Sequence, residues 1–172
     1  SLRSMEADGI ITRTVYPEVP PRVEYALTEL GESMRPIIKS METWGLAYKA
    51  QKYRIRRFPM PDIQNTKKLP ACPVETTLTL ISDKWKVLIL RDLLTGTKRF
   101  GELKKSIGQV SQKVLTAQLR QMEESGLVNR KVYAEVPPKV EYSLTDLGHS
   151  LKPIMDAMWT WGEHYQHSQE QN

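Results

Sequence analysis

Between Ala71 and Glu124 the apolar residues recur every three or four positions, a spacing that predicts amphipathic helices. The first expected helix begins at Pro73, because proline fits the first turn, and the second follows a cap at Ser82 or Asp83 and stops at Thr95-Gly96. Both are expected to be core elements, with their apolar faces formed by Val74, Leu78, Ile81, Trp85, Leu88, Ile89 and Leu93. The third and fourth helices are expected over Phe100 to Ile107 and from a Ser111 cap to Glu124.

After the fourth helix the apolar spacing changes to two, which predicts strands over residues 128–133 and 140–144. The connecting tip, residues 134–138, contains two prolines that cannot donate to a strand ladder. A last helix is expected near a Thr145 cap, with Pro153 kinking or restarting it. Three helices followed by a hairpin predict a mainly α chain with a small β-hairpin, a winged helix-turn-helix.

The N-terminal part of the chain repeats part of this pattern. Residues 2–48 match residues 119–165 at an offset of 117, and about 27 of the 47 aligned positions are identical. The clearest shared block is V-P-P-R-V-E-Y at 19–25 and V-P-P-K-V-E-Y at 136–142. The first copy therefore corresponds to the end of the fourth helix, the wing and the last helix. The winged helix is predicted to be complete in the second copy and partial in the first.

This repeat predicts the domain organisation. The expected parts are a partial copy at 1–58, a proline-bearing polar linker at 59–70, a complete domain at 71–166 and a tail at 167–172. The partial copy ends in a basic helical extension over residues 48–58. It cannot close a winged-helix core alone, because Val15, Tyr25 and Leu27 would face absent helices. We expect it to dock on a complete module, in the same chain or in trans by exchange, and a truncated tandem of two complete readers is equally open.

Charge placement favours a polyanionic partner. The chain has a net charge of +5 and a soluble globular composition, with 40% hydrophobic and 26% charged residues. Residues 98–139 hold nine basic and four acidic side chains, whereas residues 140–172 hold one basic and five acidic ones. This polarity predicts that one face binds double-stranded DNA. With no uninterrupted apolar stretch of 18 residues and no signal-peptide pattern, we expect a cytoplasmic protein that does not contact a membrane.

The fourth helix has two faces when its residues are placed 100° apart. Val114, Leu115, Leu119 and Met122 form the apolar side, and Lys113, Thr116, Ala117 and Arg120 lie opposite. Amide and guanidinium groups pair with base edges, and lysine and arginine hold phosphates. The predicted DNA-binding residues are Arg99, Lys104, Lys105, Ser111, Gln112, Lys113, Thr116, Arg120, Lys131 and Lys139. The alternative is a helix face that is exposed to solvent and binds no DNA.

The second copy closely resembles the HxlR-type winged-helix transcriptional regulators, which are MarR-like. The matching blocks are C-P-V-E-T-T-L at 72–78, S-D-K-W-K-V-L-I-L at 82–90, R-F-G-E-L at 99–103, V-L-T-A-Q-L-R at 114–120 and V-P-P-K-V-E-Y-S-L-T-D-L-G at 136–148. The resemblance implies a bacterial-type DNA-binding regulator that dimerises through its terminal helices. Here the dimer is expected to be a homodimer or an intrachain pseudo-dimer. The implied dimer interface comprises Val74, Leu78, Leu151, Ile154, Met158 and Trp161.

Cys72 is the single cysteine, which excludes an intrachain disulfide. A lone cysteine beside an apolar helix is most often a small buried side chain. Its place before a helix N-terminus instead favours a thiolate that oxidants or electrophiles attack. Some HxlR-type regulators use the cysteine at the matching position as a redox sensor, so the resemblance makes Cys72 a redox-sensing candidate.

Other site chemistry is weakly supported. His164 and His167 have a metal-compatible spacing, but Ala47 and Ala50 hold the matching positions in the first copy, so we expect no metal site. No catalytic constellation or phosphate loop stands out, so we expect neither an enzyme nor a cofactor. The alternative function is a protein-interaction module that keeps the dimerising helices and binds little specific DNA.

Overall fold

A computed structural model describes residues 1–55 and 69–170. The predicted linker and the end of the basic helical extension lie mostly outside these residues. The described chain forms two compact units, one containing Ser1–Lys39 and Ala157–Asn172 and the other containing Ser40–Asp156. Helices α3 (Arg35–Ile55) and α9 (Lys152–Glu170) contribute residues to both units. The division by copies, 1–58 and 71–166, remains an interpretation of the repeat.

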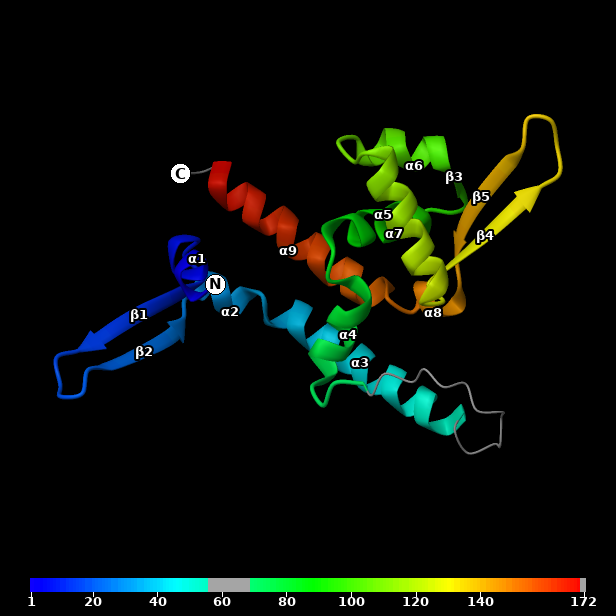
Figure 1. The fold of residues 1–172 in the computed structure, drawn as a ribbon. Helices are drawn as coiled ribbons and strands as arrows, with labels where there is room; N and C mark the ends of the chain where they lie inside the picture. Colours follow the sequence, from blue (N-terminus) through cyan, green and yellow to red (C-terminus); the bar gives the residue numbers. More distant parts are fainter. Residues whose placement is uncertain (56–68, 171–172) are drawn as a thin grey trace. The chain divides into compact units, whose positions relative to one another are not determined.

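The second unit, residues 40–156, contains the predicted helices with nearly the expected bounds (Figure 1). They are α4 (Pro73–Ile81), α5 (Lys84–Leu94), α6 (Phe100–Ile107) and α7 (Gln112–Glu124). The Asp83 carboxylate accepts from the Trp85 backbone N–H at 2.8 Å and caps α5, and the Ser111 hydroxyl accepts from Val114 at 3.2 Å and caps α7. Gly108 ends α6 with a φ of 80°, which favours glycine. The predicted helix starts and stops are confirmed.

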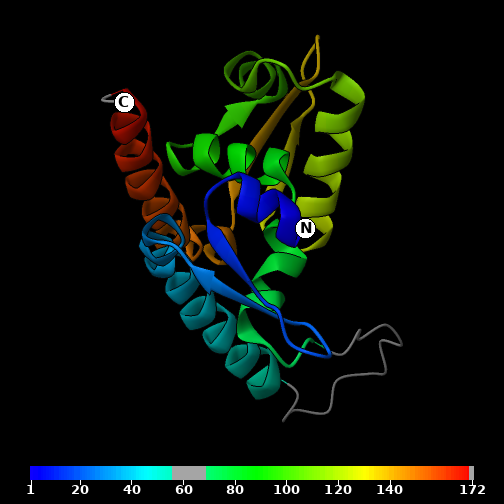
Figure 2. The same ribbon diagram turned by 90° about the vertical axis from the view of Figure 1, so that its left-hand side faces the viewer.

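The hairpin is part of a three-stranded antiparallel sheet (Figure 2). Its strands are β3 (Lys98–Arg99), β4 (Val128–Tyr133) and β5 (Lys139–Leu144), and β5 lies in the middle. Val128 pairs with Leu144 at the base of the hairpin. The prediction included β4 and β5 but missed β3, because two residues are too short to show an alternating pattern.

The core of the second unit lies between α5, α6, α7 and the base of the hairpin. Its fully buried side chains include Ile89, Leu90, Leu93, Leu103, Leu115, Leu119, Met122, Leu127, Leu151 and Ile154. Helix α8 (Asp146–His149) begins after the Thr145 cap, and α9 restarts with Pro153 in its first turn, as predicted. Proline is tolerated there because no intrahelical hydrogen bond is lost.

Helix α4 corrects one part of the prediction. Thr76 and Thr77 are fully buried, whereas Leu78 is 40% exposed and Val74 is half-buried. The Thr77 hydroxyl donates to the carbonyl oxygen of Met41 at 2.7 Å. The buried face of α4 therefore packs on α3, a helix of the first copy, and the periodicity of one copy alone could not reveal that partner. Leu78 is not a core residue.

The first unit contains residues 1–39 of the partial copy. Its elements are α1 (Leu2–Ala7), β1 (Ile11–Tyr16), β2 (Arg22–Leu27), α2 (Glu29–Ser33), the start of α3 and the part of α9 after residue 156. Tyr25 is 44% exposed, whereas the matching Tyr142 is 8% exposed, as expected if covering helices are absent from the described residues. Val15 was also expected to face absent helices, and this expectation was wrong. Val15 is 50% exposed, and the matching Val132 of the complete copy is 52% exposed as well, so this position is not covered in either copy.

Candidate nucleic-acid interface

Helix α7 separates its side chains as the sequence predicted. Leu115, Leu119 and Met122 are buried against the unit's core. The predicted DNA-binding residues of this helix, which are all exposed, are Ser111, Gln112, Lys113, Thr116 and Arg120. The Thr116 hydroxyl donates to the Gln112 carbonyl at 2.8 Å, which fixes its position on the helix. The exposed face therefore presents amide, ammonium, hydroxyl and guanidinium groups together.

Gln118, on the apolar side of α7, ties this helix to α5. Its Nε2 donates to the Asp83 carboxylate at 3.2 Å, while the other oxygen of that carboxylate caps α5. The contact anchors α7 against the neighbouring helix and accounts for a polar residue on the core side. Sequence periodicity could not identify the partner, which is 35 positions away.

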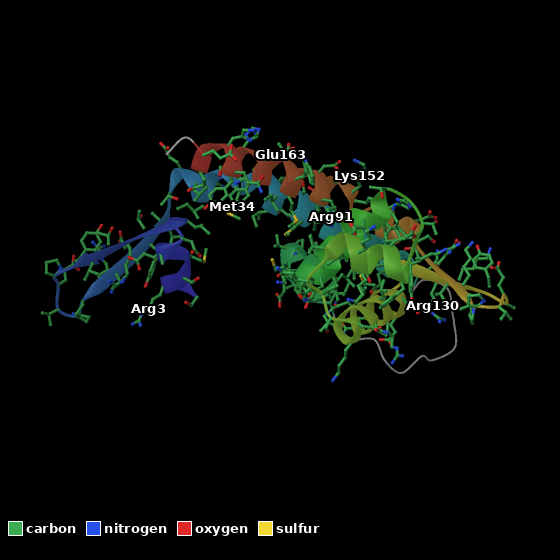
Figure 3. The ribbon with its side chains drawn as sticks, turned by 90° about the horizontal axis from the view of Figure 1, so that it is seen from above. Arg3, Met34, Arg91, Arg130, Lys152 and Glu163 are labelled. Carbon is green, nitrogen blue, oxygen red and sulfur yellow. The ribbon has the colours of Figure 1, made fainter. Side chains whose placement is uncertain are left out.

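Arg130 is a candidate that the sequence prediction omitted. It lies on β4 and is exposed (Figure 3). Together with Thr116 and Arg120 of α7 it lines a groove of about 280 Å³. The two arginines thus line one concave surface between helix and hairpin. The available sequence signal was the position of Arg130 within the basic segment 98–139.

A second groove, of about 450 Å³, lies between the start of α6 and the tip of the wing. Arg99 and Lys139 both line it, although they are 40 positions apart in the sequence. Strand β3 brings them together, because Arg99 pairs with Glu141 of β5. The two predicted cations therefore share a surface. Lys104 is half-buried and Lys105 is exposed, both on α6.

Lys139 is held by a clasp across the wing. Its Nζ lies 2.7 Å from a carboxylate oxygen of Glu141, and the Tyr133 hydroxyl donates to the same carboxylate at 2.9 Å. The hydrogen bonds from Lys139 and Tyr133 hold the pKa of Glu141 below its ordinary value, and Glu141 raises the pKa of Lys139. Lys131 and Lys139 also lie 4.9 and 4.5 Å from the Tyr133 ring centroid. Lys139 would have to exchange Glu141 for a phosphate in order to contact DNA.

The first wing repeats the clasp at the matching positions. The Tyr16 hydroxyl donates to Glu24 at 3.1 Å, Arg22 lies 3.3 Å from the same carboxylate, and its guanidinium lies 4.2 Å from the Tyr16 ring centroid. Because the clasp forms in both copies, we infer that it stiffens the wing and does not depend on the helices that cover β5.

The two copies contact each other reciprocally. In the second unit the Trp44 indole donates to the Ser150 hydroxyl at 2.8 Å, and in the first unit the Trp161 indole donates to Ser33 at 2.8 Å. Each residue of one pair is 117 positions from its counterpart in the other, so the contact has the form of an isologous interface. Of the predicted dimer residues, Trp161 takes part directly, Met158 is half-buried, and Leu151 and Ile154 lie in the core of the second unit.

Cys72 and His164, the remaining candidates, are not part of α7. Cys72 is exposed and immediately precedes α4, so the expectation of a small buried side chain is wrong. His164 lines a groove of about 500 Å³ with Trp161 and Tyr165. Across the described residues, no group of three potential metal ligands occurs. No helix in the described parts of the chain combines the length and the apolar character that a membrane span requires.

The order of α5, α6, α7 and a hairpin whose base closes the core defines a winged helix-turn-helix protein, a class that binds DNA through the helix after the turn. The model of the HxlR-like helix-turn-helix family matches residues 1–53 and 80–170, which include parts of both copies. The chain belongs to this family, and it is a DNA-binding transcriptional regulator.

Relatives and solved structures agree with that assignment. YdeP of Bacillus subtilis (strain 168), described as an uncharacterized HTH-type transcriptional regulator, is 51% identical over 94 residues, which is 55% of this chain and 73% of YdeP. A regulator of Methanothermobacter thermautotrophicus with the same description is 48% identical over 99 residues, or 58% of this chain and 76% of the relative. The redox regulator HypR in its oxidized form is 48% identical, with a TM-score of 0.52 over 54% of this chain and 96% of HypR. The reduced form of HypR is 45% identical, with a TM-score of 0.54 over 58% of this chain and 99% of HypR.

Proposed function

We propose that the chain regulates transcription in the cytoplasm by inserting α7 into the major groove of duplex DNA, while the wing contacts the flanking backbone. The observation that carries this proposal is the exposed face of α7, where Lys113, Thr116 and Arg120 stand opposite a fully buried apolar face. This orientation leaves the polar groups available to base edges and phosphates. The chain acts by binding and not by catalysis.

The surrounding cations give each part of this interface a role. Lys113, near the N-terminus of α7, is suited to a phosphate or a guanine edge, and Arg120 with Arg130 is suited to the bidentate contacts that guanidinium groups make. Arg99 and Lys139 line the groove beside the wing tip, so they are assigned to the backbone next to the base-reading helix. The clasp limits the mobility of the wing and thereby lowers the entropy lost on binding.

Cys72 is proposed as the regulatory residue. Its thiol is exposed and stands before the first turn of α4, the helix that packs on α3. HypR, a related structure, is described as a redox regulator and has been solved in oxidized and reduced forms. A disulfide between the Cys72 thiols of two chains, or an adduct at Cys72, would displace α4. Helix α4 contacts α5, and the Asp83 cap of α5 holds Gln118 of α7, so the displacement would reach the helix that reads DNA. Control by an unidentified ligand is the alternative.

The assembly is proposed to be a pseudo-dimer within one chain. The support is the reciprocal pair of indole–serine hydrogen bonds, which joins residues of the two copies. In this arrangement the first copy supplies a C-terminal helix and a wing, and the second copy supplies the single complete reader among the described residues. A homodimer through the same helices is the competing arrangement.

Selection from a random duplex library tests the DNA-binding proposal. Wild-type protein is expected to enrich a defined sequence, and Arg120→Ala is expected to lose about 1–3 kcal/mol of discrimination at one base position. Lys152→Ala is the matched control, because Lys152 is exposed and pairs with Asp156 at 2.6 Å on α9. Wild-type protein that enriches no sequence would instead favour the protein-interaction module, a second candidate supported by the partial first copy.

A further inference from the structure

Glu141 is an acidic residue placed among the cations of the second wing. Its strand, β5, lies between β3 and β4 (Figure 1). Glu141 pairs with Arg99 of β3 on one side and with Lys131 of β4 on the other. Residues directly opposite each other in an antiparallel sheet project from the same face, so the carboxylate lies in a row between two cations. Lys139 lies two residues earlier on β5 and therefore on the same face.

The contacts of Glu141 occupy groups that could otherwise bind a phosphate. Its carboxylate lies 2.7 Å from the Lys139 Nζ and accepts from the Tyr133 hydroxyl at 2.9 Å. The hydrogen bond from Lys139 lowers the pKa of Glu141 most, that from Tyr133 comes next, and the charge of Arg99 lowers it further. Carboxylates and phosphates both accept charge-assisted hydrogen bonds from lysine and arginine. A DNA phosphate that approaches this face therefore meets cations that already have an anionic partner.

The first wing shows which part of this arrangement belongs to the second wing alone. Glu24 occupies the matching position and contacts the tyrosine and the basic residue of its own wing. Among the described residues its sheet has two strands, and Thr14 stands opposite Glu24 where the second wing has Lys131. The Glu24 side chain is 52% exposed, whereas that of Glu141 is 22% exposed. Water and salt screen a less exposed ion pair less, so Glu141 holds its lysine more firmly.

We propose that Glu141 competes with DNA phosphates for Lys139 and thereby limits the affinity of the wing for duplex DNA of any sequence. On binding, the Lys139 ammonium leaves the carboxylate for a phosphate, while the Tyr133 hydroxyl keeps the carboxylate in the wing. The loss of this ion pair is the same on every sequence, because phosphates carry no direct sequence information. Retention on DNA then depends more on the base contacts of α7. This role of Glu141 rests on the DNA-binding function proposed above.

Glu141→Gln tests this role, because it removes the negative charge and keeps an acceptor for the Tyr133 hydroxyl. The affinities of the full chain for a random duplex and for the selected duplex are measured by fluorescence anisotropy at one salt concentration and neutral pH. Glu141→Gln is expected to bind both duplexes about three to ten times more tightly than wild type, by the same factor for each. A substitution that only damaged the wing would weaken binding instead.

Glu24→Gln is the matched control, since it removes the same charge from the matching position of the first wing. It is expected to change the affinity by less than about twofold. Lys139→Met removes the cation for which Glu141 competes, so adding Glu141→Gln to that variant should give less than about half of the gain seen alone. In an NMR titration of the carboxyl groups, the pKa of Glu141 should rise when the duplex is bound, because Lys139 withdraws its hydrogen bond.

Several results would overturn the role of Glu141 and leave the DNA-binding proposal standing. They are equal affinities of wild type and Glu141→Gln, an equal gain in Glu24→Gln, a full gain in the Lys139→Met background, or a Glu141 pKa that the duplex does not change. A gain confined to the selected duplex would also overturn it, because it would assign Glu141 to base reading. A wild-type chain that binds neither duplex would overturn the DNA-binding proposal itself, and the role of Glu141 with it.

Discussion

Replacing Gly45 by alanine probes the contact between α4 and α3, and Gly162→Ala provides a control of the same chemistry. Both glycines lie inside helices and at matching positions of the two copies. Alanine favours a helix by about 1 kcal/mol over glycine at either position. The difference between the two variants therefore reports only what the added methyl group meets.

At Gly45 the methyl carbon would stand 2.0 Å from the Pro73 carbonyl oxygen, so α4 must move. Overpacking costs about 1–3 kcal/mol, and losing the Thr77–Met41 hydrogen bond costs about 1 kcal/mol more. After subtraction of the gain in helix propensity, Gly45→Ala is expected to lower the free energy of unfolding by about 1–3 kcal/mol. At Gly162 the methyl group would meet no atom of the described residues within 4 Å, so Gly162→Ala is expected to raise the free energy of unfolding by up to about 1 kcal/mol.

Urea unfolding followed by far-UV circular dichroism measures both variants against wild type. The expected order of midpoints is Gly162→Ala, then wild type, then Gly45→Ala. Hydrogen exchange at α4 should accelerate in Gly45→Ala and remain unchanged in Gly162→Ala. Equal unfolding free energies for the two variants would show that the first turn of α4 does not pack against Gly45 of α3.

Three further outcomes are expected. Thr77→Val should lower the free energy of unfolding in urea by about 1–3 kcal/mol, because the buried Met41 carbonyl loses its side-chain donor, and Thr77→Ser should restore most of it. In an NMR titration of the carboxyl groups, the pKa of Glu141 should lie below its ordinary value of 4.5, and Lys139→Met should raise that pKa. Because the pKa is lowered in the folded state, the clasp stabilises the wing above pH 4.5. This stabilisation is lost as the pH falls through the folded-state pKa. Cys72→Ser should make DNA affinity indifferent to diamide or a quinone, and an unchanged response in that variant would exclude thiol sensing at this residue.

Local signals in the sequence were sufficient for most elements of the complete copy. The bounds of α6 and the Ser111 cap of α7 follow from residues within one turn of each helix end, so periodicity and capping chemistry locate them. The exposed side of α7 followed from angular placement alone. These features depend on neighbours in the sequence, which is why they were predictable.

What was missed depends on contacts between distant residues. Thr77 is buried because its hydroxyl donates to a carbonyl oxygen of the other copy, 36 positions away. An apolar pattern instead predicts that Leu78 is the buried residue. Arg130 belongs to the candidate site because the fold places β4 beside α7. Strand β3 forms because its two residues pair with the free edge of β5. Two residues are too few to show the alternation of apolar and polar positions that predicts a strand.

The salt dependence of binding measures whether the exposed face of α7 binds duplex DNA through its cations. Affinity for the selected duplex is measured against salt concentration for wild type, for Lys113→Ala combined with Arg120→Ala, and for Lys152→Ala. Loss of the Lys113 phosphate contact should reduce the slope of log affinity against log salt by about 1, and loss of the Arg120 base contact should weaken binding further. The double variant should therefore show a slope shallower by about 1 and much weaker binding. Lys152→Ala should retain the wild-type slope. A double variant with the wild-type affinity and slope would show that α7 does not bind DNA through Lys113 and Arg120.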